Sequence, residues 1–245
     1  MKAISLEQAN VESALASKLK MYPQVRRAGV IGAFAMVAFI VYLFLMWGIV
    51  IGVVYGMTAN VLVDPVTIMQ FASQHRFVVV AIYTSPFVAA FALNTLLIAL
   101  RQAHSGQPAL ADAAWFAGAF GSVAAIVEAS TALVGVPTLA DVYLRDPSVA
   151  IAGMISVAAI ANGLHMVNFV GWGAAILLAS LAARRERTMP LALAGYCVLA
   201  GLAGIATLFV AQPLFFVQLA FVPWFAAVGW MLRVPTASRV REALT

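Results

Sequence analysis

Long apolar runs separated by short polar segments make up most of this chain. Five runs contain no Asp, Glu, Lys or Arg, and they cover residues 28–63, 77–100, 113–127, 147–183 and 188–232. A helix that crosses a membrane needs about 20 mainly apolar residues, because each residue rises about 1.5 Å through a hydrocarbon core about 30 Å thick. Runs of this length predict transmembrane helices.

Two of these runs do not correspond directly to one helix each. The last run is 45 residues long, about twice what one helix can use, and the Gln212–Pro213 pair near its middle predicts a turn. The third run is extended past Glu128 to residue 136, because Gly135 and Pro137 are expected to end that helix. The pattern therefore predicts an all-α, polytopic membrane protein, a bundle of six transmembrane helices with spans near residues 29–57, 77–101, 111–136, 150–183, 190–210 and 214–233.

The regions outside the spans are short. Residues 28–234 form the predicted membrane domain, preceded by an N-terminal segment (1–27) and followed by a tail (235–245). The first 20 residues are expected to form either an in-plane amphipathic helix on an anionic leaflet or a solvated leader. A cleaved signal peptide is not expected, because residues 1–27 are polar and charged.

Composition supports the assignment to the membrane and excludes several classes of protein. Hydrophobic residues make up 64% of the chain and charged residues 9%, whereas a soluble domain is nearer half apolar and a quarter charged. The mean hydropathy is +1.00. A disulfide scaffold is excluded because Cys197 is the only cysteine, and we expect it to be a buried core residue.

The basic residues predict the orientation of the chain. With six spans, 12 of the 14 Lys and Arg residues fall on one side, and only Arg76 and Arg145 fall on the other. Because loops rich in Lys and Arg face the cytoplasm, both termini are expected to be cytoplasmic. These residues lie in short segments between apolar runs and do not form a basic patch, so a nucleic-acid partner is not expected despite a pI of 9.7.

The fourth predicted span carries a polar stripe. Asn162, His165, Asn168 and Trp172 recur at intervals of three or four residues and so share one helix face. Polar side chains within a span are costly in contact with lipid, so this stripe should face the bundle or a wet cavity.

Glu128, in the third span, is the second ionisable group expected within the membrane. The antiparallel directions of the two spans place Glu128 level with Asn162 and His165 in the outer half of the bilayer, and we expect it to bond one of them because an unpaired carboxylate is expensive there. The candidate ligand-binding residues are therefore Glu128, Asn162, His165, Asn168, Trp172 and, on the second span, Asn94. The alternative is that these side chains are only glue between helices.

Several intramembrane chemistries lack their residues. A retinal Schiff base needs a lysine within a span, and a bis-histidine haem needs a second histidine there. Zinc-protease and CxxC motifs are also missing, so no metal site or catalytic residue is predicted and the cofactor is unknown. Ser122 with His165 as base would suggest a serine protease, but the flanking pattern of a nucleophile motif is missing.

The chain resembles a family of six-span bacterial inner-membrane proteins whose function is undefined. The resemblance rests on "GLHMVNFVGWGAAILLASL", the Arg184–Arg187 loop and "MPLALAGYCVLAGLAGI", and it is strongest over Gly163–Ile205. It implies a multi-pass protein of the cell inner membrane and carries over no catalytic residue.

Three functions follow as hypotheses. The leading one is a bundle in the lipid bilayer that binds, and transports, a small or lipidic ligand or a proton in an enclosed polar cavity beside Glu128, reached from the non-cytoplasmic side. The second is an accessory subunit of a larger complex, with membrane-protein partners or further copies of the chain. The third is an intramembrane enzyme that uses Glu128 and His165 as an acid–base pair.

Overall fold

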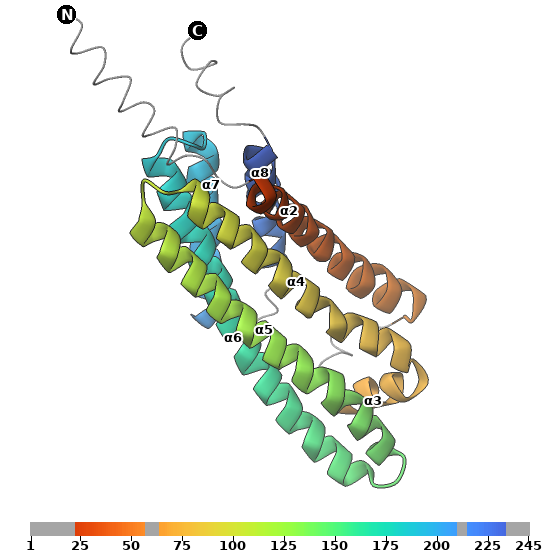
Figure 1. Cartoon of the computed structure of the whole chain (residues 1–245). Coiled ribbons are helices and arrows are strands. Elements are labelled where there is room, and N and C mark those ends of the chain that lie inside the picture. Colours follow the sequence, from red (N-terminus) through yellow and green to blue (C-terminus); the bar gives the residue numbers. More distant parts are fainter. Residues whose placement is uncertain (1–22, 57–63, 210–214, 234–245) are drawn as a thin grey trace, which may run out of the picture.

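The described part of the chain is entirely helical. The computed structural model describes residues 23–56, 64–209 and 215–233, and it contains no strand within them. The elements, in chain order, are α2 (Pro23–Phe44), the π-helix η1 (Leu45–Val54), α3 (Pro65–Gln74), α4 (Arg76–Ala103), α5 (Pro108–Tyr143), α6 (Pro147–Arg185), α7 (Leu191–Ala206), the 3-10 turn η3 (Thr207–Phe209) and α8 (Phe215–Arg233) (Figure 1).

Five helical segments are long and apolar enough to cross a membrane, which confirms an all-α protein of membrane type. They are Pro23–Val54, Arg76–Ala103, Pro108–Tyr143, Pro147–Arg185 and Leu191–Phe209. The sixth predicted span coincides with α8, where Val217–Arg233 is a shorter apolar helix. The segments 1–22, 57–63, 210–214 and 234–245 lie outside the described residues, and with them the predicted N-terminal helix, the Gln212–Pro213 turn and the tail.

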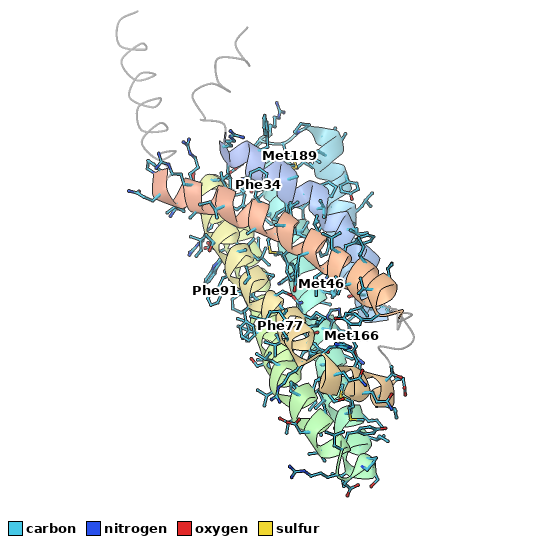
Figure 2. The ribbon with its side chains drawn as sticks, turned by 90° about the vertical axis from the view of Figure 1, so that its right-hand side faces the viewer. Phe34, Met46, Phe77, Phe91, Met166 and Met189 are labelled. Carbon is cyan, nitrogen blue, oxygen red and sulfur yellow. The ribbon has the colours of Figure 1, made fainter. Side chains whose placement is uncertain are left out.

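Large apolar side chains cover the outside of the bundle. Phe77 and Phe91 on α4 are largely exposed, and Phe34 on α2 is partly exposed beside α8 (Figure 2). In water such a surface would drive association, whereas in a bilayer it contacts acyl chains. The exposed surface therefore fits a chain whose solvent is lipid.

The antiparallel helices α5 and α6 form the longest and most closely packed pair of the bundle. Small residues bring the two helices together. A Cβ atom placed on Gly171 would lie 2.6 Å from the Cα atom of Gly121 and 2.8 Å from the carbonyl oxygen of Ala117, so the two main chains are in direct contact. The register is the same along the pair, where the facing residues are Gly118 with Ala175, Gly121 with Gly171 and Gly135 with Val157.

Only part of α6 is covered by the rest of the bundle. Its second half packs on α5 and α7 and is almost continuously buried from Asn168 to Ala183. Its first half packs on α5 and, near its start, on α3, and Val149, Ile155 and Ile160 are exposed there. The reason is length, because the 39 residues of α6 span about 58 Å and the 16 residues of α7 only about 24 Å.

The structure differs from the prediction at the end of the bundle where α5 turns into α6. The third span does not end at Gly135–Pro137, because α5 continues through Pro137 to Tyr143. Proline is tolerated in membrane helices where neighbouring groups and small adjustments satisfy the freed backbone. Here Pro137 is buried, and its neighbours Val136 and Ala140 belong to an apolar cluster shared by α3, α4, α5 and α6.

Two of the helices at this end begin with an aspartate cap followed by proline. Asp64 caps α3, which forms within the first predicted outer loop, and Asp146 caps α6. The carboxylate of Asp146 accepts hydrogen bonds from the amide of Val149 at 3.2 Å and the hydroxyl of Ser148 at 2.7 Å. These bonds favour the charged form and hold the pKa of Asp146 below its usual value of 3.8.

The cap of α6 should therefore weaken in acid. A lowered pKa means that the ionised cap stabilises the helix above pH 3.8, and that this contribution is lost as the pH falls through the pKa of the folded state. We expect the exchange protection of the Val149 amide to fall below pH 3.8. In Asp146→Asn, whose amide also caps a helix but does not titrate, the fall should disappear. An unchanged pH profile in that variant would contradict the assignment.

The Gly121–Gly171 contact should tolerate no added atom. Gly171→Ala places a methyl group against backbone that cannot move aside, and we expect it to destabilise the protein by about 1–3 kcal/mol. Gly195→Ala in α7 is the matched control, because its Cβ meets nothing within 4 Å and should be neutral or stabilising by up to about 1 kcal/mol. Unfolding in detergent measures both, and equal stability of the two variants would disprove the contact.

Candidate functional site

Glu128 and His165 form the predicted hydrogen bond between α5 and α6. The Nδ1 atom of His165 lies 2.9 Å from the Oε1 atom of Glu128. The common register of the two helices explains the pairing, since it also brings Gly121 opposite Gly171 two turns away. Both side chains are accessible, with 38% of the histidine side chain and 23% of the glutamate side chain exposed.

An aromatic ring packs against the histidine of this pair. The ring of Phe169 meets that of His165 edge to face, with centroids 4.6 Å apart. Tyr83, on α4, lies within electrostatic range of Glu128, and sequence reasoning did not select it. Asn162, one turn before His165 on the same face of α6, is exposed, so the surface next to the pair is accessible there.

The depth of the pair follows from helix geometry. His165 is 19 residues from Arg184, which corresponds to about 28 Å along α6. Taking Arg184 as one boundary of a hydrocarbon core about 30 Å thick places the pair close to the opposite boundary. Helix α7 stops covering α6 at the same level, because Gly204 packs against Phe169 and the described part of α7–η3 ends at Phe209.

The C-terminal part of the polar stripe, Asn168 and Trp172, points into the protein and not toward the exposed pair. Asn168 and Trp172 are 6% and 2% exposed, and Ser122 on α5 is buried as well. The Oδ1 atom of Asn168, the Nε1 atom of Trp172 and the hydroxyl of Ser122 have no hydrogen-bond partner among the described residues. The structure thus divides the stripe into an open part, Asn162 and His165, and a buried part within the helix contact.

Asn94 is likewise not joined to the pair. Its amide donates a hydrogen bond to the carbonyl of Ala90, 2.8 Å away in the same helix. Arg101 lies two turns further along the same face of α4 and is exposed. It pairs with Asp112, and its guanidinium group lies 5.5 Å from the ring centre of Trp115. These contacts are those of a helix near a membrane boundary.

A second Glu–His pair lies at the opposite end of the bundle and was missed in the sequence. The Nδ1 atom of His104, in the α4–α5 turn, is 2.6 Å from the Oε2 atom of Glu186, in the α6–α7 turn. Here the side chains are only 4% and 16% exposed. The signal in the sequence that indicates this pair is that the α4–α5 and α6–α7 turns lie on the same side of an antiparallel bundle.

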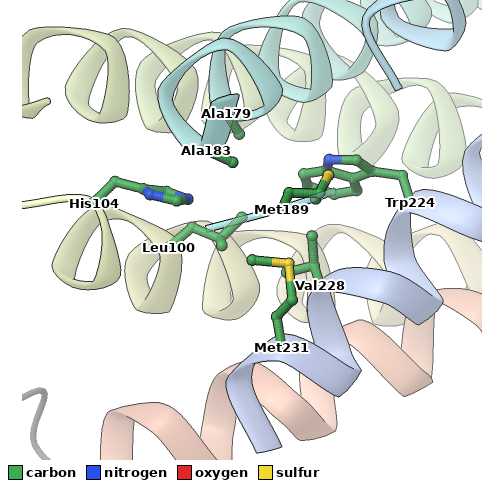
Figure 3. Close-up of a pocket in the computed structure, with 8 residues that line it drawn as sticks. All are labelled: Leu100, His104, Ala179, Ala183, Met189, Trp224, Val228 and Met231. Atoms are coloured by element: carbon green, nitrogen blue, oxygen red, sulfur yellow. The ribbon is translucent and has the colours of Figure 1, made fainter. Parts of the chain in front are cut away.

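Neither cavity described in the structure borders Glu128 or His165. One, of about 10 Å³, lies between α4, α6 and α8 beside His104 and Trp224 (Figure 3). The other, of about 20 Å³, is lined by apolar residues and Tyr83. A volume of 10 Å³ holds about one water molecule, whereas pockets for small molecules measure about 300–1,000 Å³. The expected enclosed cavity beside Glu128 is thus not among them.

The pair offers hydrogen bonding and proton exchange. A carboxylate and an imidazole share one proton easily, and each keeps further donor or acceptor capacity for a bound group. The described residues contain no cluster of three or more His, Cys, Asp or Glu side chains that could hold a metal ion.

Comparison with protein-family models, with curated proteins and with solved structures finds no match to this chain. The similarity to a six-span family of undefined function therefore stays a prediction made from the sequence. What the site does must be argued from its own geometry.

Proposed function

We propose that the protein is a six-span integral membrane protein of a bacterial inner membrane, with both termini in the cytoplasm. Seven of the nine arginines in the described ranges lie at one end of the bundle, at the start of α2, at the ends of α4 and α8, and around the α6–α7 turn. An excess of Arg and Lys marks the cytoplasmic side. On this orientation Glu128 and His165 lie near the non-cytoplasmic boundary.

We further propose that Glu128, His165 and Asn162 bind a lipidic or small polar ligand from the side of the bundle. The observation that carries this proposal is the partial exposure of a hydrogen-bonded acid and base beside an exposed amide. A polar group that only joins two helices gains most when it is buried between them. This pair instead keeps accessible surface near the level where α7 ends.

The two Glu–His pairs of this chain illustrate the difference between a link and a site. His104 and Glu186 are buried, joined to each other and used to hold two turns together. His165 and Glu128 form the same kind of bond, but they remain partly exposed. We assign a structural role to the first pair and ligand binding to the second.

The chemistry of the site limits the ligand. The carboxyl and imidazole groups together offer both hydrogen-bond acceptors and a donor, so the pair suits a partner that carries a donor and an acceptor group. The depth of the pair matches the region where acyl chains meet polar headgroups. A zwitterionic phospholipid, which offers both a cationic amine and an anionic phosphate, fits these requirements.

This proposal can be tested with a phosphatidylethanolamine that carries a photoreactive diazirine near its headgroup. In nanodiscs the wild-type protein should cross-link at residues 159–167, and Glu128→Gln should reduce the yield about tenfold, because a hydrogen bond to a charged group contributes about 1.5–3 kcal/mol. Glu186→Gln is the matched control and should leave labelling unchanged. Equal labelling of all three proteins would exclude this ligand class.

Stability distinguishes the two roles independently. Glu186→Gln removes a charge from a buried bond and should destabilise the protein by about 1–3 kcal/mol, whereas Glu128→Gln should cost less than about 1 kcal/mol. Thermal unfolding in detergent compares the variants. If Glu128→Gln were the more destabilising, the pair would be glue between helices.

An accessory role in a larger complex is the second candidate, and one observation favours it. The outer half of α6 exposes small residues, among them Ala152, Ser156 and Ala159, which suit close packing against a helix of another subunit. In that case changes on this face would release partners or copies of the chain without affecting the lipid cross-link.

A further inference from the structure

The turn between α6 and α7 concentrates positive charge at the end of the bundle. Arg184, Arg185 and Arg187 fall within four residues, and all three are exposed. Arg184 and Arg187 have no ion pair in the described ranges, and Arg185 has only a long hydrogen bond of 3.4 Å to the side-chain oxygen of Gln107. Arg101, by contrast, is neutralised by Asp112.

The one acid in this turn is withdrawn from the arginines. Glu186 sits between them in sequence, but its carboxylate is only 16% exposed and bonds to His104. It also packs against Gly106, where an added Cβ would come within 2.8 Å of the Oε1 atom. The His104–Glu186 pair therefore leaves the positive charge of the turn uncompensated on its outer surface.

Arg187 has an unusual backbone conformation for an arginine. Its φ of 55° is the one positive value of a non-glycine residue among the described residues. The amide of Thr188 donates to the carbonyl of Ala183 at 3.0 Å and the amide of Arg187 to that of Arg184 at 3.2 Å, which is the Schellman pattern that ends a helix. Glycine or asparagine suits that position best. Arginine is strained there, which points to a role for its side chain.

We propose that Arg184, Arg185 and Arg187 bind the phosphate of an anionic phospholipid headgroup. The turn lies where the long helix α6 ends among other arginines, at headgroup depth, and guanidinium groups bind phosphate through paired N–H donors. This site lies about 28 Å along α6 from His165, so it is independent of the ligand site proposed above. Its function is to hold the bundle against an acidic leaflet.

The experiment uses the full-length protein in nanodiscs of phosphatidylglycerol mixed with phosphatidylcholine, and native mass spectrometry counts the phosphatidylglycerol molecules retained after release. Each arginine near an anionic surface should contribute about fivefold to retention, which corresponds to about 1 kcal/mol. We expect Arg187→Gly to lower retention about fivefold while the melting temperature stays equal or rises, because glycine relieves the strained conformation.

The matched control is Arg145→Gly, in the α5–α6 turn at the other end of the bundle, which removes an equal charge from an exposed arginine and should leave retention unchanged. Arg187→Asn, which also accepts a positive φ, repeats the test should the glycine variant fold poorly. Unchanged retention in both Arg187 variants would overturn the proposal. So would an equal loss in Arg145→Gly, or complete release of the lipid by millimolar inorganic phosphate, which would indicate a site for a soluble anion.

Discussion

The contact between the main chains of α5 and α6 is the constraint on which the rest of the structure depends. Gly121 and Gly171 let the two helices touch, and once they touch, only one register is open to them. That register sets Glu128 opposite His165 seven residues along α5, which makes the acid–base pair a consequence of glycine packing. The same contact buries Asn168 and Trp172 inside the protein. One helix contact therefore both forms the Glu128–His165 pair and excludes Asn168 and Trp172 from the exposed site.

The unequal lengths of the helices add the second determinant. Because α7 is much shorter than α6, the bundle covers one half of α6 and leaves the other half bare. His165 lies at the transition, packed against an aromatic ring but partly exposed. The two Glu–His pairs then differ in role although they share their chemistry, because covering turns bury His104 while His165 stays accessible.

The sequence predicted what depends on composition and spacing. Apolar run lengths identified the helices, and antiparallel counting brought Glu128 to His165, because both follow from a fixed rise per residue. The prediction from the sequence failed where the packing between helices determines where a helix ends or which residues are covered. Pro137 is buried beside an apolar cluster and continues a helix, and α3 forms within a loop that hydropathy could not distinguish from coil. The stripe from Asn162 to Trp172 shares one helix face, yet which part is covered depends on where α7 ends, and no spacing rule contains that information.

The length of the α5–α6 pair has a consequence for the surrounding bilayer. A helix of about 58 Å would have to lean by about 60° to fit within a hydrocarbon layer of about 30 Å, whereas membrane helices lean by at most about 40°. The pair cannot resolve this hydrophobic mismatch by tilting. Its tip, which carries α3 and the Arg76–Asp141 ion pair, must therefore extend beyond the acyl layer, and the protein presents a helical projection to whatever occupies the adjoining compartment.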